Sequence, residues 1–142
     1  MTKNSVKKSI ISIILLIVLY IVCDSPYLYL TNGIFNRVVN RIQGNNKGFA
    51  SWRLYSALLV YICLAVGVYY YVLPQIKSGD FPLKNIIVTA AIFGVVCYGV
   101  FDFTIHIMFR DYPLWVAIMD AVWGGILTSV VVILFIKLAK YI

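Results

Sequence analysis

Long apolar runs separated by short polar breaks divide the chain, and this pattern predicts four transmembrane helices. The runs cover about residues 10–30, 54–73, 85–108 and 113–136. Each is close to the ~20 apolar residues that a helix needs to cross a hydrocarbon core. Apolar and polar positions do not alternate along them, so helices are favoured over a β-barrel. We therefore predict an all-α, integral membrane four-helix bundle that forms a single domain over residues 1–142.

Prolines, glycines and one amphipathic stretch mark the connections between these runs. Pro74 is expected to end the second span, and residues 78–82 to form a turn. Asp111 and Pro113 indicate the start of the fourth span. In the first connection, an apolar face and a polar face recur at helical spacing over residues 34–43. This spacing predicts a short amphipathic helix at the outer membrane surface, although an extension of the first span or a loop helix fits it equally well.

Composition supports a membrane protein, because 63% of the residues are hydrophobic and the mean hydropathy is +0.95. Soluble domains have about 45–50% apolar residues. The net charge of +7 comes from basic residues at the ends of the apolar runs, where they contact lipid headgroups. More of them fall on the side of the termini, which predicts cytoplasmic termini. No basic stripe interleaves with exposed aromatic residues, so we expect the lipid bilayer as partner and no nucleic acid.

Aromatic and cysteine residues add little chemistry to this picture. Trp52, Tyr112 and Trp115 are expected in one aromatic belt at the membrane interface, and Tyr69–Tyr71 and Tyr141 in the other. The cysteines are three in number, lie inside apolar runs and form no CxxC motif. Neither a disulfide framework nor a zinc site is therefore expected. The sequence predicts no cofactor.

The candidate functional residues are aspartates inside the apolar runs. Asp24, Asp102 and Asp120 lie on three different predicted spans, where a carboxylate costs ~2.5–3.5 kcal/mol at the bilayer centre. The directions of the spans bring all three to one layer, roughly 6–9 Å from the midplane on the outer side. Close carboxylates cannot all stay ionised alone, so we expect a bound proton, a cation, His106 or Arg110 to compensate them. We predict that the three face the bundle interior and approach one another.

The neighbours of these aspartates support an inward orientation. Small and polar residues recur every four positions on the third span, from Ala90 through Asp102 to His106, and again on the fourth span from Asp120 to Thr128. The pattern Val-x-Tyr-x-Val-x-Asp occurs at residues 18–24 and 96–102, which suggests two related hairpins. The predicted substrate- or ion-binding residues are Asp24, Asp102, Asp120, Tyr98, Thr104, His106 and Trp123.

The same residues carry a resemblance to a known family. The chain resembles small bacterial membrane proteins grouped as domain of unknown function 2177, over residues 61–74, 94–104 and 120–127, together with Asp24. The most specific parts are Tyr98-x-x-x-Asp102-x-Thr104 and Asp120-x-x-Trp123-Gly124. The family pattern usually has asparagine after that threonine, where this chain has Ile105. The resemblance implies four spans and no established activity.

Three classes of function fit the sequence. The first is a transporter or channel-like protein that handles a cation or proton, and its small size then favours a homodimer. The second is a non-catalytic membrane scaffold, such as a virion or envelope component, since the residue usage suggests an AT-rich genome such as that of a large virus. The third is a membrane enzyme that acts on a lipid or quinone. It is least favoured because no catalytic motif is present and only His106 could serve as a base near neutral pH. A water-accessible cavity that reaches the aspartates would support transport. A dry, packed bundle whose aspartates bond Tyr, Trp or the backbone would support a scaffold, and a lateral groove open to lipid would support an enzyme.

Overall fold

The computed structural model describes residues 3–44, 54–77 and 82–141. Its elements are α1 (Lys3–Gln43), α2 (Leu54–Gly67), the π-helical turn η2 (Val68–Val72), α3 (Leu73–Lys77), α4 (Leu83–Met108), α5 (Leu114–Leu138) and the 3-10 turn η3 (Ala139–Tyr141). Within these described ranges, four helical segments are long and apolar enough to cross a membrane: residues 6–43, 55–76, 83–108 and 114–138. The predicted all-α fold with four spans is confirmed.

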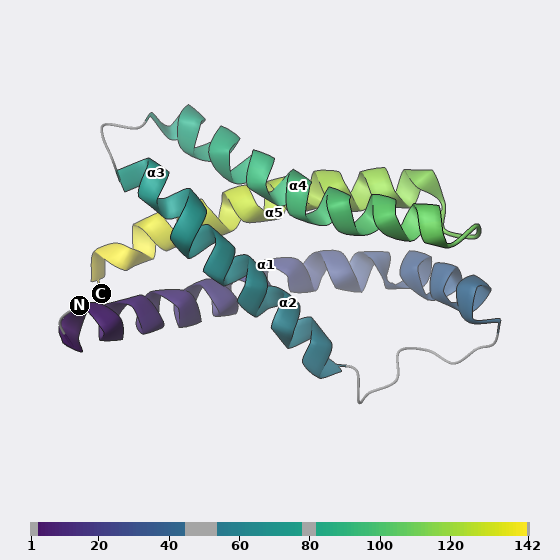
Figure 1. Ribbon diagram of the computed structural model, residues 1–142, viewed down its shortest axis with the longest axis horizontal. Helices are drawn as coiled ribbons and strands as arrows, with labels where there is room; N and C mark the ends of the chain where they lie inside the picture. Colours follow the sequence, from purple (N-terminus) through teal and green to yellow (C-terminus); the bar gives the residue numbers. More distant parts are fainter. Residues whose placement is uncertain (1–2, 45–53, 78–81, 142) are drawn as a thin grey trace.

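The helices pack as a bundle in which α5 is central (Figure 1). Helix α4 packs along α5, α1 contacts α5 from another side, and α2 crosses α1 at an angle. The beginning of α1 and the end of α5 lie at the same end of the bundle (Figure 1). The α4–α5 turn lies at the opposite end, beside the C-terminal part of α1.

The second span does not end at Pro74, which corrects the expectation from the sequence. Helix α3 continues to Lys77, and the π-helical turn η2 ends at Val72, two residues before the proline. In that turn the backbone N–H of Leu73 bonds the carbonyl of Val68, five residues earlier. Such wider turns occur as single bulges inside α-helices. Proline has no backbone N–H to donate. Because the helix is already widened just before Pro74, it continues past this residue. Of the predicted turn, residues 78–81 lie outside the described ranges.

Residues 34–43 are helical, but they continue the first span instead of forming a separate surface helix. Helix α1 has 41 residues, so it is ~61 Å long at 1.5 Å per residue, against a hydrocarbon core of ~30 Å. The apolar side of its last turns packs against the α4–α5 turn, in a cluster of Ile34, Phe35, Val38, Ile42, Tyr112, Val116 and Ala117. Because protein covers this apolar face, these turns continue α1 beside the α4–α5 turn.

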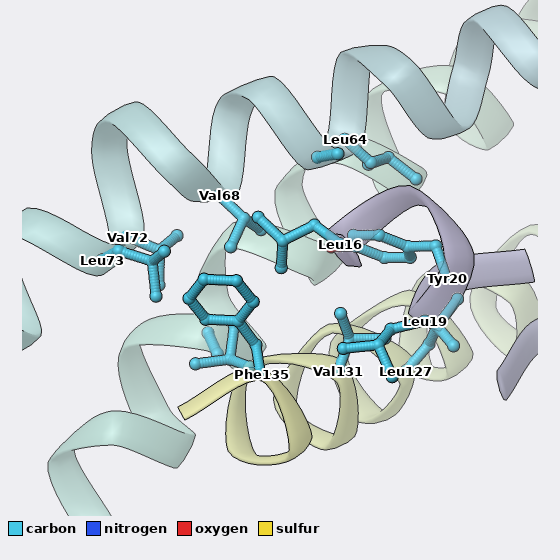
Figure 2. Close-up of a cluster of buried hydrophobic side chains, with 13 residues drawn as sticks. Leu16, Leu19, Tyr20, Leu64, Val68, Val72, Leu73, Leu127, Val131 and Phe135 are labelled. Carbon is cyan, nitrogen blue, oxygen red and sulfur yellow. The ribbon is translucent and has the colours of Figure 1, made fainter. Parts of the chain in front are cut away.

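A hydrophobic core, shown in Figure 2, joins the N-terminal half of α1 to the C-terminal half of α5. It brings together side chains of α1, of the α2–α3 segment and of α5, including Leu16, Tyr20, Leu64, Val68, Leu127, Val131 and Phe135. The hydroxyl of Tyr20 donates to Oγ1 of Thr128 across this core, at 3.2 Å. The three intramembrane aspartates lie beyond this core, toward the α4–α5 turn.

Close approach of backbones holds α4 against α5. A Cβ atom added to Gly94 would meet the backbone carbonyl of Gly124 and the side chain of Thr128. One added to Gly124 would meet the ring of Tyr98. The residues that the sequence placed on facing stripes are thus in contact.

We expect Gly94→Ala to lower the free energy of unfolding by about 1–3 kcal/mol, the usual cost of overpacking a close interface. The added methyl group would press on the backbone of α5, which cannot rotate away as a flexible side chain would. Thermal unfolding in detergent would measure the change. Gly33→Ala on α1 is the matched control, because nothing lies within 4 Å of its added Cβ. Equal effects of the two substitutions would contradict this account of the α4–α5 interface.

Candidate functional site

Asp24 links three helices through its carboxylate. Its side chain on α1 is buried, and both of its oxygens accept hydrogen bonds. The hydroxyl of Tyr61 on α2 donates to Oδ2 at 2.8 Å, and Nε1 of Trp123 on α5 donates to Oδ1 at 2.8 Å. These two donors offset much of the cost of placing a carboxylate inside the bundle.

One turn further along α1, Tyr27 makes a second connection to α5. Its hydroxyl donates to Oδ1 of Asp120 at 2.8 Å. Its ring stacks on Trp123, with ring centroids 4.4 Å apart and planes 9° from parallel. Tyr27 and Trp123 therefore form a stacked aromatic pair whose polar atoms each bind a different carboxylate, and this pair joins Asp24 to Asp120.

Asp102 on α4 is the most deeply buried of the three aspartates, with no exposed surface. Its Oδ1 accepts a hydrogen bond from the hydroxyl of Tyr112. Its Oδ2 is buried and has no hydrogen-bond donor among the described residues. The carboxyl group of Asp120 lies close enough to that of Asp102 for the two to influence each other electrostatically. No lysine or arginine in the described part of the chain pairs with either of them, so Arg110 does not provide the compensation expected from the sequence.

Tyr112 connects this interior to the α4–α5 turn. The sequence placed it in an aromatic belt at the interface, but its side chain is buried and its hydroxyl binds Asp102. Burial, and then the neighbouring Asp102 carboxyl, raise the pKa of Tyr112, so its hydroxyl stays protonated as a donor. Nδ1 of His106 donates to the backbone carbonyl of Tyr112 at 2.7 Å.

A pocket of about 330 Å³ reaches two of the aspartates. It is partly open and is bounded by all four spans, and its lining residues are Asp24, Leu28, Ala57, Val60, Tyr61, Leu64, Cys97, Tyr98, Phe101 and Asp120. Leu28, Val60 and Phe101 are exposed apolar side chains, so the open side faces the surroundings of the bundle. The pocket therefore has a polar inner end and an apolar mouth.

The structure brings most of the predicted site residues together and separates two of them. Asp24, Asp102, Asp120, Tyr98 and Trp123 form a connected interior group. Thr104 is exposed, and its hydroxyl donates to the carbonyl of Val100 on its own helix. His106 reaches the group only through Tyr112. In the described ranges, no three His, Cys or Asp side chains are placed to hold a metal ion together.

Three tyrosines of this group were not in the predicted set. Tyr27 lies three residues after Asp24, on the same face of α1, so its spacing could have revealed it. Tyr61 lies in a uniformly apolar run, where nothing distinguishes a tyrosine ligand from a packing residue. The proline turn around Tyr112 suggested an interfacial position, and only the packing of α1 against that turn buries it.

Four apolar spans around buried, hydrogen-bonded carboxylates define an integral membrane protein with an intramembrane acidic group. The chain belongs to the family DUF2177, described as a predicted membrane protein, whose family model matches residues 9–136. This confirms the resemblance noted from the sequence. A search of the curated proteins and a search of the solved structures each found no match.

Proposed function

We propose that this protein binds a proton or a monovalent cation between Asp102 and Asp120 and moves it through the membrane. The observation that supports this most is the buried Oδ2 of Asp102, which has no donor among the described residues and belongs to a carboxyl group near that of Asp120. Two carboxyl groups can hydrogen-bond to each other only when one of them carries a proton. A shared cation would satisfy the same pair.

The surroundings of Asp102 and Asp120 favour a shared proton or cation over two ionised carboxylates without a partner. Uncompensated buried charges cost several kcal/mol each, and no basic side chain in the described ranges offsets them. Ionisable residues within membrane spans generally mark ion pathways or proton relays. Asp102 and Asp120 thus need a proton or a cation that the described side chains do not supply.

Polar contacts extend from the pair in two directions. On one side, Tyr112 links Asp102 to the α4–α5 turn. On the other, Asp120 borders the pocket and binds Tyr27. The pair is therefore connected to the pocket through Asp120 and to the α4–α5 turn through Tyr112. With this path we also propose cytoplasmic termini, from the excess of basic residues on that side, and a homodimer, because the chain is short for a transporter.

Proton movement can be tested in liposomes that contain a pH-sensitive dye and carry an imposed pH gradient. We expect the wild-type protein to dissipate the gradient faster than empty liposomes do. Asp102→Asn should reduce the rate at least tenfold, because an amide cannot share a proton with Asp120 as a carboxyl does. Asp111→Asn is the matched control, since Asp111 is exposed in the α4–α5 turn. The same liposomes with a sodium or potassium gradient would test a metal cation.

Two results would contradict the proposal. One is wild-type protein that moves neither protons nor sodium or potassium faster than empty liposomes. The other is Asp102→Asn protein that moves them as fast as the wild type while folding normally.

A membrane scaffold is the second candidate, and one observation favours it. Both oxygens of Asp24 are occupied by donors from two other helices, as expected of a carboxylate that fixes helix packing. Interhelical hydrogen bonds in membranes contribute about 0.6–2 kcal/mol each. On this hypothesis the aspartates hold the bundle together, and Asp102→Asn would change neither its fold nor any ion flux.

A further inference from the structure

We infer that the pocket between the four spans is a lateral binding site for a lipophilic organic cation, a molecule with a positively charged nitrogen or phosphorus centre and apolar substituents. The inference deepens the proposed function and rests on it, because it names the class of molecule that reaches Asp120 from the side of the bilayer. Three features of the pocket support it: its inner end, its walls and its mouth.

The inner end of the pocket carries negative charge that the described residues do not neutralise. Asp24 and Asp120 line it from two different helices. The fully buried carboxyl group of Asp102 does not line the pocket but interacts with Asp120, and its Oδ2 has no donor among the described residues. A ligand that enters the pocket therefore meets carboxylate acceptors. Among the described residues, no lysine or arginine pairs with these carboxylates. An anion or a neutral acceptor would be disfavoured there, and a cation favoured.

The walls provide the contacts that an organic cation needs. The rings of Tyr61, Tyr98 and Phe101 line the pocket, and aromatic rings attract cations at their faces. The hydroxyl of Tyr98 makes no hydrogen bond within the described residues, so it is available to a ligand. The remaining lining side chains are aliphatic or cysteine. The apolar substituents of an organic cation would pack against these walls.

The mouth of the pocket opens between lipid-facing side chains. Leu28, Val60 and Phe101 line it and are 46%, 54% and 62% exposed. All three lie in segments apolar enough to span a membrane, where exposed side chains contact lipid. The volume of about 330 Å³ is in the range of small-molecule pockets, roughly 300–1,000 Å³. A lipid-soluble cation could therefore enter from the bilayer without crossing the polar surface.

Binding of tetraphenylphosphonium to the purified protein in detergent tests this inference. Equilibrium dialysis would measure the affinity, and quenching of Trp123, which binds Asp24 beside the pocket, would report the location. We expect saturable binding of tetraphenylphosphonium and no saturable binding of tetraphenylborate, an anion of the same shape. Asp120→Asn should weaken the binding of tetraphenylphosphonium at least tenfold, because it removes a charge from the inner end of the pocket.

A pair of lipid-facing substitutions provides the matched control. Val60→Trp should block the mouth and weaken binding at least tenfold. Val122→Trp should leave it unchanged, since Val122 is also 54% exposed but does not line the pocket. Equal binding of the cation and the anion, or equal effects of the two tryptophans, would overturn the inference. Proton flux without tetraphenylphosphonium binding would overturn this inference alone, whereas such binding without any ion flux would support the site and overturn the proposed transport.

Discussion

Asp24→Leu is expected to lower the free energy of unfolding by about 2–4 kcal/mol, because the substitution leaves two donors without their acceptor. The hydroxyl of Tyr61 and Nε1 of Trp123 both bind this carboxylate, and they come from helices that flank α1 on different sides. Leucine fills a similar volume but accepts no hydrogen bond. Thermal or denaturant-induced unfolding in detergent would measure the loss.

Two further variants separate lost hydrogen bonds from lost packing. Asp24→Asn keeps one carbonyl oxygen as an acceptor, so its cost should be about half that of leucine. In a Tyr61→Phe/Trp123→Phe background the donors are absent, and Asp24→Leu should then cost less than about 1 kcal/mol, by the logic of a double-mutant cycle. If leucine is as costly in that background as in the wild type, the hydrogen bonds are not what stabilises the bundle at Asp24.

The sequence was sufficient to predict the four spans and the inward faces of the helices. Long uninterrupted apolar runs have few alternatives to transmembrane helices. Four-residue spacing of small residues places Gly94 and Gly124 on facing sides, and the structure brings both into the α4–α5 interface. The repeated Val-x-Tyr-x-Val-x-Asp pattern also corresponds to similar environments, because Asp24 and Asp102 are both buried and the valines of both copies are exposed.

Tertiary contacts decide what the sequence left open. Residues 34–43 have an apolar face that fits a membrane surface as well as a protein surface, and only the neighbouring α4–α5 turn shows which one covers it. Pro74 is a normal helix stop, yet the π-helical turn before it lets the helix continue. The partners of the aspartates are mostly tyrosines, and their hydroxyl groups come from several helices. Spacing within one helix cannot reveal such pairs.

Tyr112→Phe is expected to reduce proton flux in liposomes at least tenfold while lowering stability by only about 1 kcal/mol, the usual contribution of one hydrogen bond. The hydroxyl of Tyr112 is the only donor to Asp102 among the described residues, and it lies between the α4–α5 turn and the interior. A hydroxyl both donates and accepts, so it can pass a proton to Asp102 while taking up another. Burial raises the pKa of Tyr112, which favours this exchange over release of its proton as a free tyrosinate.

Two comparisons show whether Tyr112 acts in proton movement or only in folding. Tyr29→Phe is the matched control, since this side chain on α1 is 84% exposed, and its flux should equal that of the wild type. In an Asp102→Asn background, Tyr112→Phe should cause no further loss of flux, because both residues then belong to one interrupted route. A Tyr112→Phe protein that loses stability by about 1 kcal/mol but keeps wild-type flux would assign this tyrosine a purely structural role and exclude the route past the turn.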